Sequence, residues 1–93
     1  MTNHPAPDPF AFDPERIERS EMWKDKYGLE SVDVLYTLPG GDKIGITIDA
    51  RDVSAERDAR HGLQMTFYEI VSGLSAHQRM TWAAAAQAEA VAT

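Results

Sequence analysis

The sequence predicts an α+β fold: a disordered N-terminal arm, one helix, a two-stranded antiparallel β-hairpin, and two C-terminal helices packing on the hairpin. Three of the five prolines fall in the first nine residues. Apolar and polar residues alternate on both sides of a Pro-Gly-Gly turn, and later apolar residues recur at helical spacing. Because 93 residues leave room for one core, we expect a flexible arm over residues 1–12 and one small domain over 13–93.

The arm is expected to lack regular structure, because prolines remove the backbone N–H groups that helices and strands need. Phe10 and Phe12 at its end are apolar exceptions. We expect them to pack locally against the domain, and a short docking segment is the alternative interpretation.

The first helix is predicted over about residues 14–27. Asp13 is a suitable N-cap, Pro14 suits the first helical position, and Gly28 suits a left-handed stop. The segment has few large apolar residues, so the helix should lie on the surface with one narrow side docked. These residues are Ile17, Met22, Trp23 and Tyr27.

The hairpin is predicted from two runs with a period of two, joined by Pro39-Gly40-Gly41-Asp42. Its apolar positions are Val32, Val34, Tyr36 and Leu38, then Ile44, Ile46 and Ile48. A lone hairpin is marginal in water, so we expect helices to cover its isoleucine face. Its free edges invite a third strand or a second copy of the chain.

Two helices are predicted after the hairpin. Ser54 is a suitable N-cap for a central, largely buried helix over about 55–72, which Gly73 ends. Ser75 and Gln78 form a capping box for an alanine-rich helix over about 76–91. Met80 and Trp82 lie about 200° apart around its axis, so both cannot sit at the centre of one contact.

The composition narrows the classes of function. Fifteen acidic residues against nine basic ones give a formal charge of −6, which argues against direct nucleic-acid binding. The absence of cysteine excludes disulfides and thiolate sites and is compatible with the cytoplasm. No signal-like start or long apolar run is present, so we expect a cytoplasmic protein with no membrane association.

Few residues suggest a metal-binding or catalytic role. His4, His61 and His77 have no second histidine three or four positions away, as two-histidine helical metal sites require, so we expect no metal or cofactor. Asp49 with Asp52 is the best-placed carboxylate pair. Glu69 has the most apolar surroundings of any acid, as a general acid or base with a raised pKa would. No nucleophile accompanies them, and no catalytic residue is assigned.

The sequence is most compatible with a non-enzymatic protein–protein interaction module, a small accessory or inhibitory factor that docks on a larger complex. Small size and acidity would suit a product of a phage or other mobile element. We expect large apolar side chains left outside a small core to form the interaction surface. The candidates are Trp23, Tyr27, Tyr36, Met80 and Trp82.

Three alternatives stay open. The partner could be a second copy, paired through the hairpin edge or the last helix. A small enzyme or ligand-binding domain would use Glu69 or Asp49 in a concave pocket. A dimeric nucleic-acid-linked regulator would need its basic residues on one surface, and the candidates are Arg51, Arg57 and Arg60.

Overall fold

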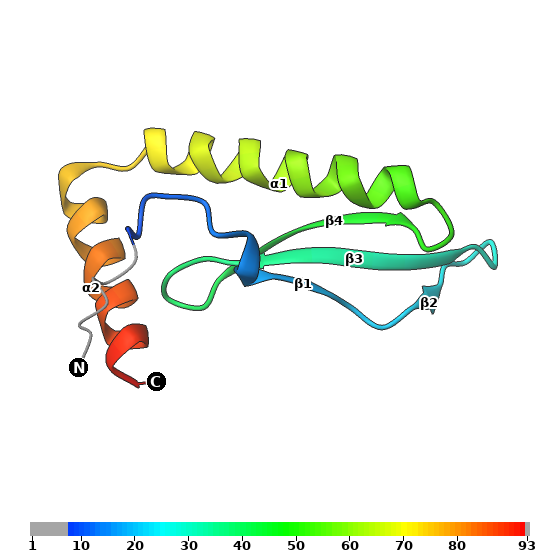
Figure 1. Ribbon diagram of the computed structural model, residues 1–93, viewed down its shortest axis with the longest axis horizontal. Helices are drawn as coiled ribbons and strands as arrows, with labels where there is room; N and C mark the ends of the chain where they lie inside the picture. Colours follow the sequence, from blue (N-terminus) through cyan, green and yellow to red (C-terminus); the bar gives the residue numbers. More distant parts are fainter. Residues whose placement is uncertain (1–7, 93) are drawn as a thin grey trace, which may run out of the picture.

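The computed structural model describes residues 8–92, which form one antiparallel sheet followed by two helices. The elements are η1 (Pro14–Arg16), β1 (Ile17–Arg19), β2 (Trp23–Lys24), β3 (Glu30–Thr37), β4 (Lys43–Asp49), α1 (Val53–Ser72) and α2 (Ala76–Ala92). β3 is central and pairs with β4 on one side and with β1 and β2 on the other. In Figure 1, α1 runs along one side of the sheet and α2 stands at the end where β3 turns into β4.

The prediction of a helix over 14–27 before a two-stranded hairpin is wrong. Asp13 does cap a helical turn, since its carboxylate accepts a hydrogen bond from the Glu15 N–H at 3.0 Å. That turn is η1, and it ends after three residues. The chain then forms β1 and β2, so the sheet has four strands and both α-helices come after it.

Pairing with β3 explains why this segment is extended. The Ser20 N–H donates to the Asp33 carbonyl at 2.9 Å, and the Asp33 N–H donates to Ser20 Oγ at 2.8 Å. These bonds fasten the break between β1 and β2 to the edge of β3. Ile17 lies opposite Tyr36 and packs against the core. A free strand edge thus outweighs the capping signals, because tertiary context overrides local propensity.

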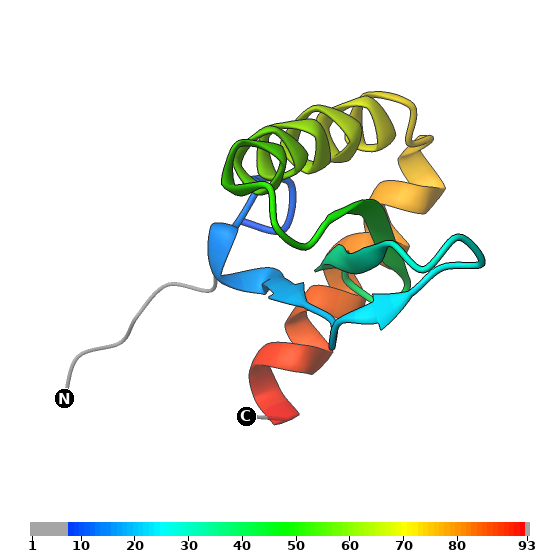
Figure 2. The ribbon, with the colours of Figure 1, turned by 90° about the vertical axis from the view of Figure 1, so that its right-hand side faces the viewer.

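The period of two sorts the strand residues onto two faces. Val34 and Tyr36 of β3 point towards α1, and each is 1% exposed. Their partners Ile46 and Ile44 on β4 lie on the same face. The opposite face, called the open face below, has no helix across it among the described residues (Figure 2). On it, the Thr47 hydroxyl donates to the Asp33 carboxylate at 2.6 Å.

Phe67 of α1 is the centre of the core and is completely buried. Four aromatic rings surround it, with centroid distances of 5.7 Å to Phe12, 5.4 Å to Tyr36, 5.3 Å to Tyr68 and 6.0 Å to Trp82. Aromatic pairs of this kind add about 0.5 to 1.5 kcal/mol each beyond burial of area. The cluster joins the N-terminal segment, the sheet and both helices.

The helices begin as their caps dictate. Asp52, and not Ser54, is the N-cap of α1, because its carboxylate accepts from the Ala55 N–H at 3.1 Å. The predicted capping box of α2 is confirmed: the Gln78 N–H donates to Ser75 Oγ, and the Ser75 N–H donates to Gln78 Oε1.

Part of the predicted arm can be located. Residues 1–7, and His4 with them, lie outside the described residues. Phe10 and Phe12 are half-buried against the core, as the local-packing interpretation expects. The Trp82 indole N–H donates to the Pro9 carbonyl at 2.6 Å. The segment from residue 8 to 12 therefore helps to attach α2.

Candidate functional site

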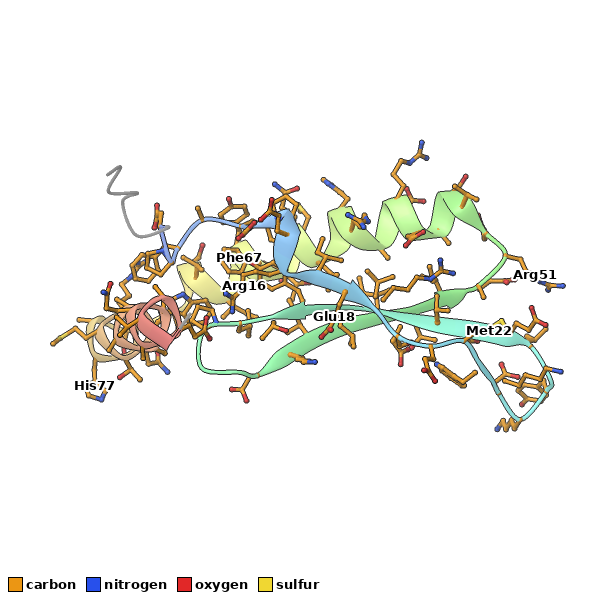
Figure 3. All side chains as sticks on the ribbon, turned by 60° about the horizontal axis from the view of Figure 1, so that its bottom comes forward. Arg16, Glu18, Met22, Arg51, Phe67 and His77 are labelled. Atoms are coloured by element: carbon orange, nitrogen blue, oxygen red, sulfur yellow. The ribbon has the colours of Figure 1, made fainter. Side chains whose placement is uncertain are left out.

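Four large apolar side chains are exposed together at the end of the sheet where β2 turns into β3. We call Met22, Trp23, Tyr27 and Leu29 the hairpin patch. They are 54%, 41%, 76% and 53% exposed. Figure 3 shows Met22 at the opposite end of the molecule from His77 of α2. Exposed large apolar side chains gathered on one short segment are candidates for an interaction site.

The turn that carries the patch is fixed by its own hydrogen bonds. The Asp25 carboxylate accepts from the Tyr27 N–H at 2.8 Å and from the Leu29 N–H at 3.0 Å. Gly28 has a φ of 79°, a conformation that costs a residue with a Cβ atom. Lys26 Nζ lies 5.1 Å from the centre of the Tyr27 ring. These bonds fix the backbone of the turn, from which the Tyr27 side chain extends into solvent.

Trp23 lies on the open face, directly across from Ser31. Ser31 is a polar residue that is only 8% exposed, whereas Trp23 across from it is 41% exposed. β2 has only two residues and sits at a sheet edge.

The structure separates the residues predicted to form the interaction surface. Trp23 and Tyr27 belong to the hairpin patch. Tyr36 and Trp82 are core residues, 1% and 9% exposed. Met80 is 72% exposed on α2, far from the patch.

Met22 and Leu29 are patch members that the sequence prediction did not include. A signal for them exists in Asp25 and Gly28, which are turn residues as well as helix-end residues. Interpreted as a turn, they would place Met22 and Trp23 on one side of a hairpin and Leu29 on the other.

A groove of about 430 Å³ lies between the N-terminal segment, the turn after β3, and α2. Glu89 at its wall accepts from Arg16 Nη1 at 3.0 Å and from the Gly40 N–H at 3.1 Å. The Arg16 guanidinium holds the pKa of the Glu89 carboxyl below its usual value, with a further contribution from Gly40. Burial raises the pKa of the Tyr36 hydroxyl, which accepts from the Asp13 N–H at 3.1 Å. These polar groups already bind one another, so they act as structural ties.

The residues suggested for catalysis do not form a site. Asp49 accepts hydrogen bonds from the backbone and side chain of Arg51, which lower the pKa of its carboxyl. Asp52 is engaged as a helix cap. Glu69 is exposed near the other end of α1, about 24 Å along the helix axis at 1.5 Å per residue from Val53. Asp49, Glu69 and His61 all lie outside the lining of the groove.

The basic residues are mixed with acids. Arg51 pairs with Asp49 at 3.4 Å, and Arg57 pairs with Asp58 at 3.6 Å, both on exposed side chains. Arg60 is exposed on α1. Such pairs weaken a positive field of the kind that phosphates require.

Within residues 8–92, no three metal-ligating side chains come together. No helix in that part of the chain is long and apolar enough to cross a bilayer. A scan against protein-family models and searches of curated proteins and of solved structures found no match to this chain. The site is therefore assigned from its geometry.

Proposed function

We propose that this protein is a non-enzymatic interaction module that docks on a partner protein through the hairpin patch, as an accessory or inhibitory factor of a larger complex. The observation that carries the proposal is the exposure of four large apolar side chains within residues 22–29, on and beside a turn fixed by Asp25. A fixed turn loses little conformational entropy when it binds, so its contacts contribute more to affinity.

The chemistry of the patch defines the partner surface. Trp23 and Tyr27 supply the aromatic anchors that dominate interface energies. Lys24 and Lys26 stand beside them and are exposed. The patch thus fits a protein surface with apolar pockets for two rings.

The proposal is tested with Tyr27→Ser and a matched control, Met80→Ser. Both side chains are more than 70% exposed, so neither change should unfold the protein. Loss of an aromatic anchor of about 2 kcal/mol weakens binding roughly 30-fold. Quantitative affinity enrichment from cells of the encoding organism should show partners that Tyr27→Ser loses and Met80→Ser retains. Equal retention by both variants, or equal loss from both, would refute the proposal.

A further inference from the structure

The outer edge of β4 has an unpaired backbone. The Ala50 N–H donates to the Glu30 carbonyl, and the Leu38 N–H donates to the Asp42 carbonyl. Antiparallel ladders alternate, so Ile44, Ile46 and Ile48 direct their backbone groups to β3. The backbone groups of Lys43, Gly45 and Thr47 point away from the sheet. No hydrogen bond from another described segment reaches the Gly45 or Thr47 backbone.

This edge lacks the features that usually prevent strand pairing. β4 is seven residues long and contains no proline and no charge between its ends. Its isoleucines Ile44, Ile46 and Ile48 are each only half-buried, although they belong to the core face. Their partners on β3 are 1% or 2% exposed. Apolar surface therefore remains along the edge beneath α1.

The charges on β4 are self-complementary. Lys43 and Asp49 are its first and last residues. In an antiparallel pair of β4 strands centred on Ile46, Lys43 lies opposite Asp49 of the second copy, and Gly45 lies opposite Thr47 of the second copy. In both of these pairs, the hydrogen bonds between the copies would use backbone groups that point away from β3. Within one copy, Lys43 pairs with Glu18 at 2.5 Å and Asp49 pairs with Arg51 at 3.4 Å, both on exposed side chains that can also reach a second copy. A slip of two residues would separate Lys43 from Asp49 of the second copy, so the charges favour this register.

We propose that the protein forms a homodimer in which β4 pairs with β4 of a second copy, in the register centred on Ile46. The two sheets become one continuous sheet, with the isoleucine rows adjacent beneath the two α1 helices. The second copy satisfies the free backbone groups of Gly45 and Thr47 and covers the exposed part of the isoleucines. This interface is separate from the hairpin patch.

The mass in solution gives the first test. Light scattering on the full chain should give twice 10.3 kDa, with dissociation on dilution. Thr47→Pro removes an outward N–H that β3 does not use, and should give a monomer. Thr47→Val loses the same hydroxyl bond to Asp33 but keeps the N–H, so it should remain a dimer. A wild-type monomer at every concentration would overturn the proposal.

Charge reversal tests the register and does not depend on how well Thr47→Pro folds. Lys43→Glu places a carboxylate opposite Asp49, and Asp49→Lys places an ammonium opposite Lys43, twice in each dimer. Each variant alone should dimerise about tenfold more weakly. An equimolar mixture of the two should recover wild-type affinity, because both pairs become complementary. A dimer that neither variant weakens, or that mixing does not restore, would contradict this interface.

Discussion

Glu89 ties together three segments that are distant in the sequence. Its carboxylate binds Arg16 of η1 and the Gly40 N–H of the turn after β3, while Glu89 itself belongs to α2. Because its folded pKa lies below the ordinary value of 4.5, the charged form stabilises the fold. That contribution is complete above pH 4.5 and is lost as the pH falls through the folded pKa.

We therefore expect Glu89→Gln to lower the free energy of unfolding by about 0.5 to 1 kcal/mol at pH 7, as partly exposed ion pairs do. At pH 3, below the ordinary pKa of 4.5, the difference from the wild type should be smaller, since part of the stabilisation by the charged carboxylate is lost there. Urea denaturation at both pH values measures this. Glu15→Gln is the control, because Glu15 is exposed and forms no ion pair within the described residues. An equal loss at both pH values would show that the Glu89 charge is not the cause.

For single residues, the sequence left open which large side chains are buried and which are exposed. The angular conflict between Met80 and Trp82 was visible from helical geometry, and the structure resolves it with Trp82 buried and Met80 exposed. The sequence alone also did not decide whether Tyr36 is buried or exposed. Its hydroxyl reaches the Asp13 N–H and its ring stacks on Phe12, contacts that exist only once the N-terminal segment folds back.

Among elements, α2 depends most on a single residue. Trp82 is its one buried side chain among those described. The indole packs 6.0 Å from the Phe67 centroid and donates to the Pro9 carbonyl. The remainder of the helix is rich in alanine, which favours helicity and buries little surface.

We expect Trp82→Ala to remove about 3 kcal/mol or more of the packing that holds α2. Site-resolved hydrogen exchange should then show amides of α2 losing protection while those of β3 and α1 keep most of theirs. Met80→Ala on the same helix should leave the protection of α2, β3 and α1 unchanged. Equal loss of protection across all elements would mean that α2 is not a separately docked unit.

Elements were predictable where local pattern and tertiary contacts agree. The alternation over 32–48 corresponds to β3 and β4, and the helices expected over 55–72 and 76–91 correspond to α1 and α2. The capping residues Asp13 and Pro14 do begin a helical turn, but that turn is only the three-residue η1. Pairing with β3 decided the conformation of the rest of residues 14–27, and a partner strand distant in sequence leaves no mark in local propensity. Of the hairpin patch, the sequence analysis named only Trp23 and Tyr27, because the turn at Asp25 and Gly28 was interpreted as the end of a helix.

At the scale of the whole molecule, we propose two surfaces for two kinds of partner. The β4 edge has free backbone groups and matched charges, which suit an identical strand. The hairpin patch presents two aromatic rings on a fixed turn, which suit pockets on a different protein. The core and α1 join the two surfaces, and α2 lies at the end of the sheet opposite the hairpin patch (Figure 1).

Site-specific photo-crosslinking in cells of the encoding organism tests this assignment most directly. A photoreactive residue at position 27 should give an adduct with a different protein, whereas one at position 47 should give an adduct of twice 10.3 kDa. The same residue at position 80 should give neither. If position 27 gave only self-adducts, or reacted no more than position 80, the central claim that the hairpin patch binds another protein would be wrong.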